Sequence, residues 1–176
     1  IVASPFSWME ATYRYTEIEN LFYGPFSYSG NQSYKDKGFD VKFRLIKETK
    51  YLPSVAFGIR DMGGTGLTAA EYFVLSKRFG RLDATLGMGF GALGLDANIR
   101  NPFVSFHESF NYRNSSIGEG GSFNFKDWLS GPNVAAFGGL EYSFPKYGLS
   151  LKVEYDTSNP DIPFGANLPL EVKSRF

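Results

Sequence analysis

Three glycines within four residues, Gly63, Gly64 and Gly66, are the first candidate for a ligand-binding loop. A phosphate-binding loop needs a strand, then the glycines, then a helix that opens with Lys-Ser or Lys-Thr. No lysine follows these glycines directly, and residues 70–79 read better at a period of two than at 3.6. We therefore interpret the glycines as an external turn that uses positive φ or close backbone packing, with a bound phosphate as the alternative.

The single histidine, His107, is the second candidate, because Ser105, Glu108 and Ser109 lie close to it in the sequence. A serine hydrolase needs a base next to a nucleophile and a third group that orients the base. No nucleophile-elbow motif accompanies His107, so we interpret it as a loop residue. A transition-metal site would usually need a second histidine or a cysteine, and the chain has no cysteine. We expect no catalytic residue, no metal site and no cofactor.

Length and composition restrict the class of protein. We treat residues 1–176 as a single unit, long enough to form a core. The formal net charge is zero, which argues against a nucleic acid partner. No apolar run approaches the roughly 18 residues of a membrane helix, and no signal segment opens the chain. With 18% aromatic residues and 20 glycines, the sequence is typical of a β-sandwich or a transmembrane β-barrel.

Alternation of apolar and polar residues recurs along the chain and predicts an all-β protein. About eight segments show this alternation, and no convincing helix interrupts them. The predicted strands are residues 9–16, 39–45, 55–60, 72–78, 84–90, 134–143, 149–156 and 170–175.

Loop lengths distinguish the two classes. Connections after the second, fourth and sixth segments are short, whereas those after the first, third, fifth and seventh are long and rich in glycine, asparagine or proline. All long loops then emerge on one side of the sheet, as in outer-membrane barrels with tight periplasmic turns. A Greek-key sandwich has no reason to segregate loop lengths. We predict an antiparallel transmembrane β-barrel, either a small closed barrel or an arc of a larger one.

Most predicted strands carry two or three charges on one face. In a sandwich these would be solvated outer faces; in a barrel they point into the lumen, while Phe, Leu, Val and Tyr face lipid. Because acidic and basic residues are balanced, we favour an ion-paired network over a basic lining for an anionic polymer. We also expect Gly87, Gly89 and Gly91 to leave room for a bulky neighbour. The predicted lumen charges are Glu10, Arg14, Asp40, Lys42, Arg44, Arg60, Arg78, Glu141, Lys152 and Glu154.

The long connection at residues 91–133 is rich in aromatic side chains among Asn, Ser and Gly. It could lie outside the membrane or fold inward as a plug. Aromatic rings beside amides suit a sugar-binding surface, although the same rings could simply pack the loop against itself or extend the barrel wall. The predicted sugar contacts are Phe103, Phe106, Phe110, Tyr112, Phe125 and Trp128.

Two stretches, residues 53–91 and residues 121–144, carry a resemblance that covers about a third of the chain. Unusual pairs in them include Arg60–Asp61, Gly63–Gly64 and Gly138–Gly139. The chain resembles the YjbH/GfcD-type outer-membrane proteins linked to exopolysaccharide and capsule export. This resemblance implies an outer-membrane barrel with periplasmic lipoprotein partners. Such proteins are several times longer, so we expect a portion of a larger barrel; with Phe176 as a genuine terminus, eight strands would close on themselves.

We therefore expect a non-enzymatic protein of the bacterial outer membrane that contacts lipid and conducts or retains exopolysaccharide. The first alternative is a small closed eight-stranded barrel that acts as a structural or adhesive anchor. The second alternative is an envelope enzyme that acts on lipid or sugar through His107.

Overall fold

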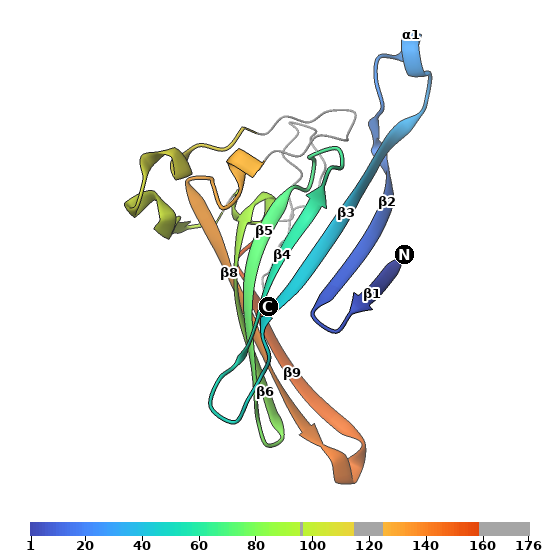
Figure 1. The fold of residues 1–176 in the computed structure, drawn as a ribbon. Helices are drawn as coiled ribbons and strands as arrows, with labels where there is room; N and C mark the ends of the chain where they lie inside the picture. The colour runs from blue at the N-terminus through green and yellow to red at the C-terminus, as the bar shows by residue number, and fades with distance from the viewer. Residues whose placement is uncertain (96, 115–124, 159–176) are drawn as a thin grey trace.

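The computed structural model describes residues 1–95, 97–114 and 125–158, and within them the chain is dominated by antiparallel strands (Figure 1). Seven of the predicted strands are confirmed, and the eighth, residues 170–175, lies outside the described residues. Two further strands, β1 and β7, were not predicted. The strands are β1 (Val2–Phe6), β2 (Met9–Phe22), β3 (Ser33–Ile46), β4 (Ser54–Met62), β5 (Ala70–Phe79), β6 (Leu82–Gly91), β7 (Ile99–Arg100), β8 (Asn133–Phe144) and β9 (Leu149–Asp156).

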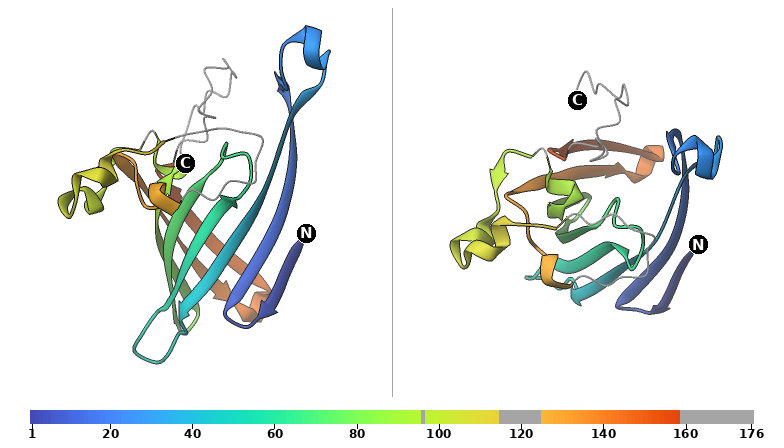
Figure 2. Two further views of the ribbon diagram at one scale, coloured as in Figure 1. Left: turned by 45° about the horizontal axis from the view of Figure 1, so that its top comes forward. Right: turned by 90° about the horizontal axis from the view of Figure 1, so that it is seen from above.

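These strands form one curved sheet in which every neighbouring pair is antiparallel. Strands β1 to β6 follow one another in order, β8 pairs with β6, and both β7 and β9 pair with β8. Seen from above, β9 lies across the interior from β4 (Figure 2). No pairing joins β1 to β9 within the described residues, so the antiparallel all-β prediction is confirmed, whereas closure into a barrel stays a prediction.

Helical segments are short and confined to connections. The one α-helix of the described residues, α1 (Phe26–Ser29), has four residues, so the expectation of no substantial helix is met. The 3-10 turns are η1 (Ala92–Gly94), η2 (Pro102–Ser105), η3 (Glu108–Asn111), η4 (Phe125–Asp127) and η5 (Pro145–Tyr147). Among the described residues, no helix has the length and apolar character needed to cross a membrane.

The predicted separation of short and long connections is confirmed up to β9, and the long connection predicted after β9 lies largely outside the described residues. Short connections join β3 to β4, β5 to β6 and β8 to β9 at one end of the sheet, which we call the hairpin end (Figure 1). The longer connections, which hold α1, the glycine turn and η1 to η4, lie at the other end, which we call the loop end. The β2–β3 hairpin rises furthest, because residues 33–38 of β3 continue past its last partner on β4.

Cross-strand register gives the sheet two chemically different faces, since directly paired residues share a face. Lys42, Gly58 and Tyr72 follow one another across β3, β4 and β5 on the polar face. Phe43, Phe57 and Phe73 follow one another on the opposite, apolar face. Turn η1 lies inside the curve of the sheet and its Leu93 reaches Gly89 on the polar face, so the polar face is concave (Figure 2).

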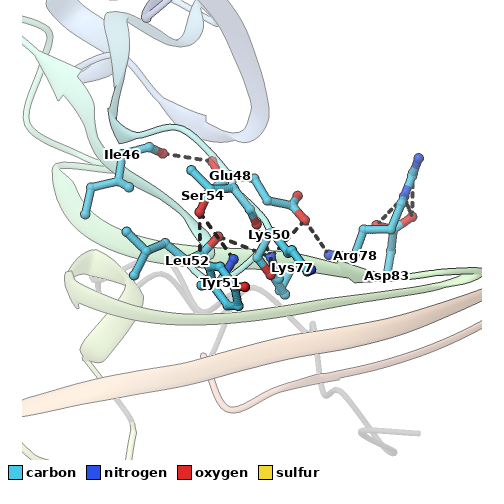
Figure 3. A network of polar contacts seen from close by, with 10 residues as sticks. Ile46, Glu48, Lys50, Tyr51, Leu52, Ser54, Lys77, Arg78 and Asp83 are labelled. Carbon is cyan, nitrogen blue, oxygen red and sulfur yellow. Dashed lines mark hydrogen bonds and ion pairs between the residues drawn. The ribbon is translucent and has the colours of Figure 1, made fainter.

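A lysine organises the hairpin end (Figure 3). Lys77 Nζ of β5 donates to the carbonyl oxygens of Thr49, Lys50 and Leu52, and lies 3.5 Å from Glu48 Oε1. These bonds hold the β3–β4 connection against β5. The core lies at the loop end, where Phe90, Val134 and Ala70 are completely buried.

Candidate functional site

The charged residues predicted to line the interior all have the register of the polar face. Neighbouring strands contribute opposite charges that pair across the face. The ion pairs are Lys42–Glu10 at 3.0 Å, Lys152–Glu141 at 3.3 Å, Arg78–Asp83 at 2.6 Å and Arg14–Asp36 at 2.6 Å. A weaker contact joins Asp40 Oδ2 to Arg14 Nε at 3.9 Å. Arg44 and Arg60 make no ion pair with any described residue. Glu154 lines a hollow that is described below. The face is therefore hydrophilic and close to electrically neutral.

At least two hollows open on the polar face among the described residues. One, of about 190 Å³, lies beside Lys42, Arg60 and Tyr72. The other, of about 330 Å³, lies beside Phe137, Lys152 and several acidic side chains. Both hollows combine aromatic residues with carboxylates and at least one cation, a set of groups that can contact the ring and the hydroxyls of a sugar.

Tyr72 and Phe137 are functional candidates that sequence reasoning missed. Each ring lies over a glycine of the neighbouring strand: a Cβ on Gly58 would lie 2.1 Å from Tyr72 Cζ, and one on Gly87 would lie 2.2 Å from Phe137. The two rings meet edge to face at 6.4 Å. The expectation of bulky neighbours over the β6 glycines is confirmed, since Phe137 covers Gly87 and Leu93 covers Gly89. No local pattern identifies them, because the pairing of each aromatic residue with its glycine depends on the register between two strands.

The glycine turn at residues 63–66 is filled by a side chain of the protein itself. Gly63 and Gly66 have φ values of 67° and 83°, as expected of a turn. A Cβ on Gly64 would lie 1.8 Å from Asp61 Oδ1, and one on Gly38 would lie 2.3 Å from the same atom. Asp61 itself has a left-handed φ of 57°. The carboxylate of Asp61 therefore packs directly against Gly38 and Gly64, which leave room for it because they lack a Cβ.

A buried polar cluster surrounds this turn. Asp36 is 1% exposed, pairs with Arg14, and accepts a hydrogen bond from the Thr65 hydroxyl. Arg14 Nη2 also donates to Thr68 Oγ1 at 2.5 Å, and the Thr68 N–H donates to Asp61 Oδ2 at 3.2 Å. These contacts tie β2 and β3 to the β4–β5 connection at the loop end.

Asp61 is the strained member of this cluster. It is 5% exposed, and its Oδ1 atom has no hydrogen-bond partner among the described residues. Burial raises the pKa of this carboxyl from 3.8 to about 6, against the opposing effect of the Thr68 N–H. Because the folded form holds the proton more tightly, the contribution of Asp61 to stability is most favourable below about pH 4 and is lost as the pH rises through about 6.

The long connection is clamped to the sheet by Arg113. Its guanidinium makes bonds of 2.8 and 2.9 Å to the two carboxylate oxygens of Glu71, and also donates to the carbonyls of Asp127 and Ala69. The Glu71 side chain is 2% exposed and also accepts the N–H of Leu129, a residue held at a φ of 59°. Glu71 lies on the apolar face, where a lone charge would be costly, so Arg113 is its required partner.

The predicted sugar-contact aromatics divide into two groups. Phe103 packs at a tilt against Phe90 of β6, with 5.6 Å between ring centroids, and Trp128 packs against Phe57 of β4 at 6.2 Å, so both lie on the apolar face. Phe110 packs against Phe103 at 5.5 Å. The second group is exposed to solvent: Phe106 (80%), Tyr112 (66%) and Phe125 (61%). Residues 99–114 and 125–132 of this connection therefore pack on the outside of the sheet at its loop end, whereas η1 lies on the polar face.

His107 has a local structural role. Its Nδ1 accepts the Ser109 N–H at 3.1 Å and lies 2.8 Å from Ser109 Oγ, which caps η3. The imidazole is exposed, and no described residue orients it from the other side. The described residues also include no group of three or more potential metal ligands of the His, Cys, Asp or Glu type.

Below the clamped connection, the apolar face exposes a continuous set of aliphatic side chains that we call the aliphatic belt. Their exposed fractions range from 40% to 63%. The belt comprises Ile46, Leu75, Leu86, Leu140, Leu151 and Val153. Exposed aromatic residues flank it, with Phe79 and Tyr147 at the hairpin end and Phe39 and Tyr155 towards the loop end.

Sequence comparison finds relatives for most of the chain. The family model YjbH, described as exopolysaccharide biosynthesis protein YbjH, matches residues 1–161. The uncharacterized lipoprotein YjbH of Escherichia coli (strain K12) is 45% identical over 172 residues, which cover 97% of this chain and 24% of that protein. The chain therefore spans about a quarter of the length of this relative. No solved structure matches the chain.

Proposed function

The chain belongs to the YjbH family of exopolysaccharide biosynthesis proteins, and on this premise we propose that its curved sheet is part of the wall of an outer-membrane β-barrel that conducts exopolysaccharide. The role is non-enzymatic: the concave polar face contacts the polymer and the apolar face contacts lipid. Polysaccharide and periplasmic lipoproteins are the proposed partners.

The aliphatic belt is the observation that carries this proposal. Moving one such side chain fully from water to an apolar environment is favourable by about 1.5–3 kcal/mol. Six of them lie exposed on one face of the sheet, and soluble monomers rarely expose a contiguous apolar patch of this kind. Lipid covers such a belt, and aromatic residues at its two ends suit the two membrane interfaces.

The polar face supports conduction because most of its charges are already paired. Pairs such as Lys42–Glu10 and Lys152–Glu141 offer hydrogen bonds to sugar hydroxyls without a net charge that would trap a polymer. The hollows beside Tyr72 and Phe137 add aromatic contacts along the same face.

A membrane anchor with a filled interior is the second candidate. It is favoured by the side chains of Tyr72, Phe137 and Leu93, which lie across the polar face rather than leaving it open. Eight strands closed on themselves leave an interior just filled by side chains, so such a barrel would pass no polymer.

Intact mass and channel current of the native protein, extracted in detergent from bacterial outer membranes, test these alternatives. A mass far above that of 176 residues together with an open-channel current in a planar bilayer is expected of a conducting barrel. Stable insertion without current, at a mass matching 176 residues, would refute conduction and favour the anchor.

A further inference from the structure

Part of the long connection extends sideways from the sheet rather than over its interior. Turns η2 and η3 extend outward from the loop ends of β6 and β8 in both orientations (Figures 1 and 2). We call the described residues 99–114 and 125–132 the collar. Its position beside the sheet places it next to the aliphatic belt, on the same apolar face.

The collar is held in this position by its own contacts. The bidentate Glu71–Arg113 pair and the Asn101 side chain, which donates to the carbonyls of Leu129 and Gly131, fix its two halves together. A tilted ring contact between Trp128 and Phe57 attaches it to β4. A collar clamped in this way cannot turn its aromatic residues towards the polar face without breaking a buried ion pair.

The chemistry of the collar surface suits the boundary between lipid headgroups and acyl chains. Phe106 and Phe125 present large rings to the outside, and Tyr112 adds a ring with a polar hydroxyl. Arg100 and Lys126 are exposed and make no ion pair with any described residue, whereas Glu108 is the exposed acid. Rings with adjacent cations favour an interface that is apolar on one side and anionic on the other.

We propose that the collar lies in the headgroup region of the outer leaflet, where Phe106, Tyr112 and Phe125 insert beside the barrel wall. This inference rests on the membrane placement of the proposed function and deepens it, because it assigns these three rings to lipid rather than to sugar. The collar thereby fixes the level at which the membrane meets the loop end of the sheet.

Site-specific photo-cross-linking in the native membrane tests the proposal. Benzoylphenylalanine replaces Phe106 in the collar, Leu140 in the belt, or Tyr28 in α1, and each variant is irradiated in intact cells. Phe106 and Tyr28 are matched in exposure, at 80% and 81%, but Tyr28 lies at the tip of the β2–β3 hairpin. All three side chains are at least half exposed, so the replacements leave the core untouched.

The expected result is capture of lipid at positions 106 and 140, with at least a tenfold lower yield at position 28. Capture at Leu140 without capture at Phe106 would overturn the collar inference while leaving the membrane placement intact. Capture of polysaccharide at Phe106 would overturn it in favour of a sugar-binding loop. Absence of lipid at Leu140 would overturn the membrane placement and the inference with it, and equal capture at Tyr28 and Phe106 would refute a specific lipid contact.

Discussion

Breaking the Glu71–Arg113 pair should release the collar without unfolding the sheet. In Arg113→Met, the buried carboxylate of Glu71 loses both guanidinium bonds and keeps the Leu129 N–H. Removing one partner of a buried pair costs about 3–5 kcal/mol. Strands β5 and β6 pair through ten consecutive residues, from Ala70–Gly91 to Phe79–Leu82. The lost free energy therefore weakens the docking of the collar rather than the pairing of these strands.

A docking loss of about 3 kcal/mol raises the population of the undocked collar roughly 100-fold. Limited trypsin digestion of the native protein in detergent measures this population, because cleavage tracks the open fraction when reclosure is fast. Arg100 and Lys126 provide cleavage sites within the collar. We expect cleavage there to be at least 30-fold faster in Arg113→Met than in the unmodified protein.

Two controls make this prediction refutable. Arg78→Met removes an ion pair that is exposed and lies at the hairpin end, and it should leave collar cleavage unchanged. Glu71→Leu combined with Arg113→Met removes both charges and should restore much of the protection, since no uncompensated carboxylate remains. A cleavage rate within threefold of the unmodified protein in Arg113→Met would show that the pair does not hold the collar.

Three further outcomes are expected. Asp61→Asn should raise the thermal unfolding midpoint at pH 8 but not at pH 4, because the carboxyl, with its pKa of about 6, is already neutral at pH 4; an equal shift at both values would refute a charge effect. Leu140→Lys should lower the free energy of unfolding in phospholipid vesicles by about 2–4 kcal/mol, as measured by urea titration. Glu154→Lys on the polar face should lower it much less, and equal losses would contradict the assignment of faces. Gly58→Ala should lower the urea midpoint of unfolding, because the added Cβ forces the Tyr72 ring aside. The double change Gly58→Ala with Tyr72→Ala should recover part of this loss, and no recovery would exclude a steric cause.

The strands were predictable because alternation is a local signal. The segment at residues 70–79, read as a strand rather than a helix after the glycines, is β5 with those bounds. Its alternation looked imperfect for two reasons that only the tertiary structure shows. Glu71 points to the apolar face because Arg113 neutralises it, and Tyr72 points to the polar face because Gly58 leaves room for its ring.

The contents of the candidate site were less predictable, because they depend on contacts between distant segments. The glycine turn was correctly read as a turn, but its occupant, Asp61, packs against Gly38 of another strand. The aromatic residues at 91–133 looked alike in the sequence. Trp128 and Phe103 are packed because they contact Phe57 and Phe90 of the sheet, whereas Phe106 is exposed. No local sequence pattern encodes these contacts.

The height of the β2–β3 hairpin determines which part of the described chain is most accessible from outside the cell in the proposed orientation. Six residues of β3 continue beyond its pairing with β4, which corresponds to roughly 20 Å along the strand. At its tip, α1 presents Phe26 at 75% exposure and Tyr28 at 81%. In the proposed orientation this tip stands above the collar and the lipid headgroups, where it is the first part of the described chain that an antibody or a phage would meet. An epitope inserted there would report surface display on living cells.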